Sequence, residues 1–209
     1  MRSTPRPRNS TRCRRGIGLL AALALGASAA TVAAQPAAGP DAAKMQQLQK
    51  MMKKQIGLMK PELRKKVMGL SPDTKMALIT IYSQHSRHSD ALTLRQVMQE
   101  VLADFQSVMD GVVTDNGEQT AAAARRLANH RIPRGGLLPY LRPEDVTDEK
   151  IAMLVPFNNA VEGNAKRLAA AADKGDMDTA ARLMGDVANG CVACHQVFRG
   201  QPGVSDQLQ

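Results

Sequence analysis

Near the end of this 209-residue chain stand Cys191, Val192, Ala193, Cys194 and His195, in the order Cys-x-x-Cys-His. On an α-helix, residues i, i+3 and i+4 share one face, so the two thiols and the imidazole would point toward one flat partner. Two thiols can add to the vinyl groups of a porphyrin, and the adjacent histidine can ligate its iron. The motif therefore predicts one haem c, attached through Cys191 and Cys194 and ligated by His195.

A thioredoxin-like dithiol, half of a zinc site and chance are the alternative interpretations of this motif. A thioredoxin dithiol follows a strand and opens the helix of a βαβ unit, and a zinc site needs a second pair of ligands. The sequence around Cys191 has neither context. An expected export of the chain also favours haem, because covalent haem attachment follows secretion.

The first 34 residues have the pattern of a secretory signal peptide. They contain six arginines and no acidic residue, and the apolar run 17–34 ends in small residues. Val32 and Ala34 suit positions −3 and −1 of the cleavage site. An uncleaved membrane anchor is the weaker alternative, because the run has no charged flank on its far side. We expect a periplasmic protein without a stable membrane span, in which both remaining cysteines belong to the haem motif.

Composition favours helices and removes the support for nucleic-acid binding. Aromatic residues make up 2% of the chain, there is no Trp, and Ala, Leu and Met are frequent. Without the six arginines of residues 1–34, the formal net charge falls from +9 to +3. Residues 41–70 still carry eight basic and two acidic side chains, whereas residues 71–209 carry fourteen basic and seventeen acidic ones. We therefore expect no nucleic-acid partner.

Residues 35–88 are predicted to be a linker followed by a basic, methionine-rich helical extension. Residues 35–40 contain two prolines and a glycine, which disfavour a helix. Six of the twelve methionines follow between Met45 and Met76, at helical spacing with other apolar residues. Such a stripe is more typical of adaptable packing than of a metal site. The positive charge of the extension suggests that it contacts an acidic surface on a redox partner, on anionic lipid or on the protein's own bundle.

Residues 89–200 predict an all-α fold, a four-helix bundle whose C-terminal helix attaches the haem. Apolar residues recur at i, i+3, i+4 and i+7 in each predicted helix. Residues 201–209 are expected to form a flexible tail. The predicted elements are a helix from Ser89 or Asp90 to 113, a helix over 118–129, an irregular crossover over 130–143, a helix from Thr147 or Asp148 to Ala172 that Pro156 kinks or starts, and a helix from Met177 through the motif.

This arrangement resembles the class II cytochromes c, the cytochrome c-prime group and its low-spin, methionine-ligated relatives. The resemblance covers about residues 90–200 and rests on Cys-Val-Ala-Cys-His-Gln-Val-Phe-Arg at 191–199, with weaker support from residues 168–176. It implies a haem between the bundle helices. It also places a basic residue, Arg199, near the proximal imidazole, where it could offset a haem propionate. A solvated arginine at a helix end is the alternative for Arg199.

The resemblance leaves two options for the sixth iron ligand. In the low-spin relatives a methionine on the first bundle helix supplies it, whereas the c-prime members place an apolar residue there and leave the iron five-coordinate. The family spacing falls at Val97 or Met98. Since Met98 lies on the predicted apolar stripe, we predict that its thioether binds the iron, with core filling as the alternative.

Other side chains are weaker candidates for the haem site. His85, His88 and Met109 are alternative distal ligands, although a solvated histidine or a core methionine is the simpler interpretation of each. His130 could hydrogen-bond a propionate or be an ordinary loop histidine.

Two functions follow from the two coordination states. With Met98 bound, the protein would be an electron carrier that meets redox partners in the periplasm or at the inner membrane. With an open iron site, it would bind nitric oxide or carbon monoxide. The sequence contains no other catalytic constellation, so no enzyme is expected. Assembly as a homodimer is also allowed for.

Overall fold

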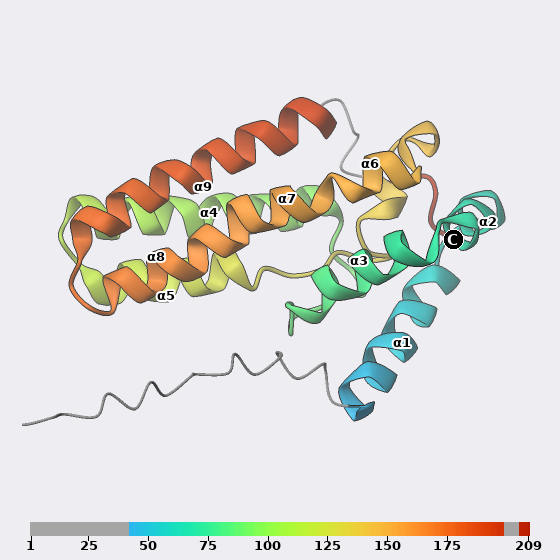
Figure 1. Ribbon diagram of the computed structural model, residues 1–209, viewed down its shortest axis with the longest axis horizontal. Helices are drawn as coiled ribbons and strands as arrows, with labels where there is room; N and C mark the ends of the chain where they lie inside the picture. The colour runs from blue at the N-terminus through green and yellow to red at the C-terminus, as the bar shows by residue number, and fades with distance from the viewer. Residues whose placement is uncertain (1–41, 199–204) are drawn as a thin grey trace, which may run out of the picture. The chain divides into compact units, whose positions relative to one another are not determined.

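The computed structural model describes residues 42–198 and 205–209 (Figure 1). The predicted signal peptide, the linker over 35–40, Arg199 and the first part of the tail lie outside the described residues. In the described part of the chain the secondary structure is helical, and the only β contacts are two isolated bridges. The predicted all-α class is confirmed. None of the helices in the described ranges is long and apolar enough to span a membrane.

The helices occur in the order predicted, with additional short elements. The extension contains three helices, α1 (Ala42–Gly57), α2 (Pro61–Gly69) and α3 (Pro72–Ser83). The other helices are α4 (Leu94–Val113), α5 (Gly117–Ala128), the 3₁₀ turns Leu138–Tyr140 and Pro143–Asp145, α6 (Asp148–Ala152), α7 (Leu154–Asn158), a π-helix (Asn159–Gly163), α8 (Asn164–Ala172) and α9 (Met177–Phe198).

The first bundle helix, α4, begins later than we predicted, at Leu94 rather than near Ser89 or Asp90. Thr93 caps it in a capping box with Gln96. The residues before Thr93 form backbone hydrogen bonds with the crossover instead. The Ser89 amide donates to the Ile132 carbonyl, and the Ile132 amide donates to the Arg87 carbonyl, both at 2.9 Å. A backbone N–H that serves another segment cannot extend the helix.

Four helices form the bundle, in which α4 packs on α5, α5 on α8, and α8 on α9 (Figure 1). Small residues allow these close contacts. The core between α5, α8 and α9 is built largely from alanines, and Gly111 of α4 lies where an added Cβ would be 2.4 Å from the Thr120 hydroxyl of α5. The alanine-rich sequence of α5 and α8 is therefore a packing surface.

The third bundle helix contains two irregularities where we predicted one. The helix is interrupted at Met153, between α6 and α7, and Pro156 lies in the first turn of α7, where a missing N–H is tolerated. The π-helix over 159–163 then joins α7 to α8. The sequence analysis did not predict this π-helix, in which i→i+5 hydrogen bonds add one residue to a single turn.

The extension shares a hydrophobic core with the crossover. Apolar residues of the extension are buried against residues of the crossover and of α6 and α7, including Met59, Leu63, Val67, Leu70, Leu78, Tyr82, Ile132, Leu138, Leu141, Val146, Ile151 and Leu154. The Tyr82 hydroxyl also accepts a hydrogen bond from the Leu137 amide at 3.1 Å. The methionine-rich stripe therefore finds at least part of its burial within this chain, and the described residues, 42–198 and 205–209, belong to one compact unit.

The end of the chain is ordered against the extension, which corrects our prediction of a flexible tail for its last residues. Leu208 forms a β-bridge with Met59, and the Lys60 amide donates to the Gln207 carbonyl at 2.8 Å. The Gln209 amide donates to the Leu58 carbonyl at 2.8 Å. These bonds satisfy backbone groups between α1 and α2 that no helix uses.

Replacing Leu63 by Ala tests whether the extension is an integral part of the fold. Leu63 is 2% exposed and packs against the crossover. We expect the free energy of unfolding to fall by about 2–5 kcal/mol, the usual loss for a buried leucine. Met68→Ala is the control, because Met68 lies on the same helix but is 61% exposed. Its effect should stay within about 0.5 kcal/mol. Equal effects in chemical denaturation would contradict the shared core.

Candidate haem site

Helix α9 carries the whole Cys-x-x-Cys-His motif in its last two turns. Cys191 and Cys194 are free and half-buried, and the His195 side chain is exposed. Because the three residues occupy positions i, i+3 and i+4 of a continuous helix, they share one face. The structure therefore supplies the local geometry on which the haem prediction depends.

The surroundings of the first thiol are apolar. Cys191 packs against a cluster of Leu127, Ala128, Ala165 and Val187, which also contacts Val101, Phe105 and Val161. These residues come from α4, α5, the π-helix, α8 and α9, so every helix of the bundle contributes to the floor beneath the motif. A porphyrin face requires such an environment, and the residues present fit a haem.

The approach of α9 to the π-helix depends on Gly190, the residue before Cys191. A Cβ at Gly190 would lie 2.9 Å from the Val161 Cγ2 atom and 3.0 Å from the carbonyl carbon and oxygen of Ala160. Two of these atoms belong to the backbone and cannot rotate away. A glycine is therefore needed for the first thiol to lie this close to the third bundle helix.

The two thiols do not have the properties of a redox-active dithiol. Burial raises the pKa of Cys191, and burial together with the neighbouring Cys191 raises the pKa of Cys194 to about 11. Reactive dithiols instead have at least one lowered thiol pKa. The thioredoxin-like interpretation therefore gains no support from the structure.

Met98, the predicted distal ligand, lies in the first two turns of α4 and is half-buried. Its neighbour Val97 is 0% exposed and occupies the core face. Val101, one turn after both, contacts the apolar cluster that includes Cys191. The start of α4 is thus close to the motif helix, but which of the two side chains would face the iron stays a prediction. Met109 is three turns further along α4 and is 42% exposed.

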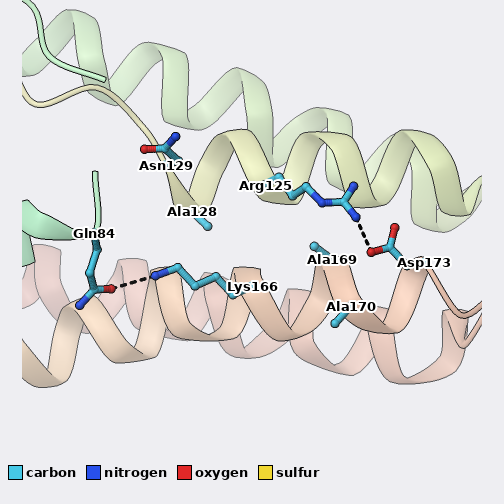
Figure 2. Close-up of a pocket in the computed structure, with 8 residues that line it drawn as sticks. All are labelled: Gln84, Arg125, Ala128, Asn129, Lys166, Ala169, Ala170 and Asp173. Carbon is cyan, nitrogen blue, oxygen red and sulfur yellow. Dashed lines mark hydrogen bonds and ion pairs between the residues drawn. The ribbon is translucent and has the colours of Figure 1, made fainter. Parts of the chain in front are cut away.

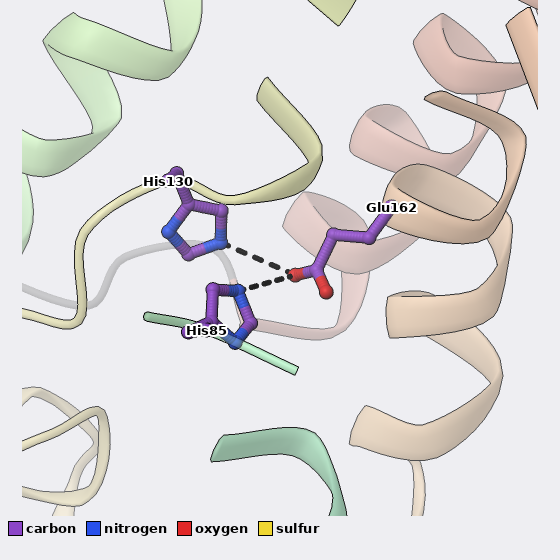
Figure 3. Close-up of side chains that lie close together, drawn as sticks. All are labelled: His85, His130 and Glu162. Carbon is purple, nitrogen blue, oxygen red and sulfur yellow. Dashed lines mark hydrogen bonds and ion pairs between the residues drawn. The ribbon is translucent and has the colours of Figure 1, made fainter. Parts of the chain in front are cut away.

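Of the three histidines considered as weaker candidates, His85 and His130 lie together, whereas His88 lies apart from them. His88 is exposed and pairs with Ile132 in a β-bridge, and partial desolvation of its ring lowers its pKa. His85 and His130 meet Glu162 of the π-helix, with ring centroids 4.6 Å apart (Figure 3). Sequence reasoning missed Glu162, because a single acidic residue in an alanine-rich helix has no distinguishing pattern.

A hollow lined by alanines and polar side chains opens between α5 and α8, separate from the haem motif (Figure 2). Its two ends are closed by Arg125, which pairs with Asp173, and by Lys166, which donates to the Gln84 side chain at 2.8 Å. No motif residue lines it. The hollow is therefore no candidate for the porphyrin.

Gly190→Ala tests whether the contact of α9 with the π-helix sets the position of the motif. The added methyl group would meet backbone atoms, so we expect a loss of about 1–3 kcal/mol in the free energy of unfolding. Gly185→Ala on the same helix is the control, because nothing lies within 4 Å of a Cβ there. That change should stabilise the helix by about 0.5–1 kcal/mol. Thermal melts of both variants give the comparison, and a neutral Gly190→Ala would refute the argument.

Comparison with known proteins identifies a relative of this chain. The chain is 30% identical to cytochrome c' from Alcaligenes xylosoxydans xylosoxydans over 128 residues, which cover 56% of this chain and 98% of that protein. No family model matches the chain. No solved structure matches it either.

Proposed function

Because this chain belongs to the cytochrome c' family, we propose that it is a periplasmic c-type haem protein that carries electrons. The observation that supports this most directly is the helical placement of the motif over an apolar floor from all four bundle helices. Cys191 and Cys194 would form the thioethers, and the exposed imidazole of His195 would ligate the iron. When bound, the haem supplies reversible one-electron chemistry or an axial site for a diatomic gas.

The chain's own residues hold and shield this group in the proposed function. Val101, Phe105 and Val161 would exclude water from the porphyrin face beside Cys191. Arg199, four residues after His195 in the sequence, would balance propionate charge. The thioether of Met98 would complete the coordination of the iron, which favours electron transfer over ligand exchange.

A second candidate function is gas binding, and Val97 is the observation that favours it. Val97 is wholly buried on the core face of α4, whereas Met98 is only half-buried. If Val97 faces the iron, an apolar side chain occupies the distal position and the iron stays five-coordinate. Nitric oxide or carbon monoxide would then bind at that position.

The extension offers a basic surface to a redox partner in this proposal. The exposed lysines Lys50, Lys53, Lys60 and Lys65 on and between α1 and α2 have no carboxylate within ion-pair distance among the described residues, whereas Lys54 pairs with Asp90 at 2.7 Å. Unpaired positive charge of this kind accelerates encounter with an acidic protein and loses its effect as salt increases. The partner would be an acidic redox protein in the periplasm or at the inner membrane.

Covalent attachment is tested by haem staining after denaturing electrophoresis. Wild-type protein expressed with its own export signal should keep the stain, because thioether bonds survive denaturation. Replacing both Cys191 and Cys194 by Ser should abolish it. Cys13→Ser is the matched control, because Cys13 lies in the predicted signal peptide, and it should keep the stain. A wild-type protein without haem would remove the basis of the proposed function.

The sixth ligand is tested by the absorption spectrum of Met98→Ala. The wild-type protein should be low-spin, with a weak sulfur-to-iron band in the oxidised form. Met98→Ala should become high-spin, because no thioether remains at that position. Met109→Ala, on the exposed side of the same helix, should leave the spectrum unchanged. A high-spin wild-type protein that binds carbon monoxide readily would favour the second candidate function.

A further inference from the structure

A second cluster of metal-ligating side chains lies in the interior, outside the haem motif (Figure 3). His85 follows α3, His130 begins the crossover, and Glu162 belongs to the π-helix. The Nε2 atoms of His130 and His85 lie 3.2 Å and 3.4 Å from the same Glu162 oxygen, Oε1. The side chains of His85, Glu162 and His130 are 1%, 8% and 17% exposed. Three distant segments of the chain therefore bring three ligands together away from water.

The hydrogen bonds of the two imidazoles determine which nitrogen is free. Nδ1 of His85 lies 3.0 Å from the Ile81 carbonyl oxygen, and Nδ1 of His130 lies 2.9 Å from the Arg131 carbonyl oxygen. A carbonyl oxygen only accepts, so Nδ1 carries the hydrogen in both rings. In the neutral rings Nε2 then presents a lone pair toward Glu162. Metal-bound histidines commonly have this arrangement, with Nδ1–H held by a carbonyl.

Protons alone leave this cluster incompletely satisfied. Burial acts to lower the pKa of His130, but the hydrogen bond and the charge of Glu162 raise it overall. Burial acts to raise the pKa of Glu162, but its contacts with both histidines lower it overall. A single proton between His130 and Glu162 still leaves the Nε2 of His85 with only its 3.4 Å contact to the Glu162 Oε1, and it leaves the Oε2 of Glu162 buried without a hydrogen-bond partner within the described ranges. Such buried polar atoms are costly.

A metal ion would satisfy the converging atoms together. In a tetrahedral zinc site with ligand bonds of about 2.0–2.1 Å, two ligand atoms lie roughly 3.3 Å apart. The observed separations of 3.2 Å and 3.4 Å fit this value, and all three ligand atoms lie within 4.8 Å of one another. We propose that His85, His130 and Glu162 form a buried site for one divalent transition-metal ion, best suited to zinc, with water as its fourth ligand.

Two features of the surroundings support a built site. The π-helix inserts an extra residue in the turn that contains Glu162, and such insertions are frequent at functional sites. The hollow of Figure 2 lies beside the cluster, because Gln84 and Asn129 directly precede the two histidines and Lys166 follows Glu162 by one turn. The proposal does not depend on the proposed function, since no haem-motif residue takes part.

Zinc binding to the complete protein tests this site. The protein, purified with any haem it carries and treated with EDTA, should bind one Zn²⁺ per chain in a calorimetric titration. Zinc-edge X-ray absorption should show two imidazoles and oxygen ligands at about 2.0–2.1 Å, without sulfur. This spectrum is recorded on the wild-type protein, so it holds even where a variant fails to fold. A lack of binding, or sulfur or single-imidazole ligation, would overturn the proposal.

Variants then assign the ligands. Glu162→Gln and His130→Gln should each weaken zinc binding by more than about 100-fold, since even partners of metal ligands contribute 10–100-fold. His88→Gln is the matched control, because His88 lies three residues from His85 but outside the cluster, and it should bind zinc like the wild-type protein. Equal binding by Glu162→Gln, or loss of binding in His88→Gln, would show that zinc binds elsewhere.

Discussion

The contact between α9 and the π-helix is the constraint on which the rest of this structure depends. Gly190 allows the α9 backbone to lie against Ala160 and Val161, and Cys191 follows directly. Val161 faces the apolar cluster beneath the motif, while the next residue, Glu162, meets His85 and His130. Adjacent residues of one irregular turn thus serve two different environments, an apolar floor for haem and a polar interior cluster.

The extension is an integral part of the fold, because its apolar side chains and those of the crossover bury one another. An irregular crossover with three prolines between 130 and 143 cannot bury its apolar side chains by itself. Leu63, Val67 and Leu78 cover Leu138 and Leu141 in a common core. On α1 and α2 the exposed lysines are Lys50, Lys53, Lys54, Lys65 and Lys66. The extension therefore combines a packing role, which the structure shows, with a charged surface on which the proposed encounter with a partner depends.

Much of the fold was predictable from local sequence signals. Ser71 and Pro72 start α3, Asn116 starts α5, and the helical class follows from apolar periodicity, because caps and periodicity act over a few residues. The predicted start of α4 was wrong because backbone groups of residues 87–92 form hydrogen bonds with the crossover, which is distant in sequence. The same limit applies to the sites. A motif of contiguous residues such as Cys191–His195 can be identified from sequence, whereas a cluster assembled from three segments cannot.

The buried cluster also explains why those three segments stay together. The segment after α3 is tied to the end of α5 by Ser86, whose amide donates to the Asn129 side chain at 2.9 Å and whose hydroxyl accepts from the same side chain at 2.8 Å. These bonds place His85 and His130 side by side, and both rings then lie against Glu162 of the third bundle helix. Separating the segment of either histidine would leave the buried Glu162 carboxylate with one partner fewer, and breaking such a buried pair costs more than the contact itself provides. A proton shared by these groups, or the proposed metal ion, therefore joins the extension, the crossover and the bundle at one point, next to Val161, which lies against the helix that carries the haem motif.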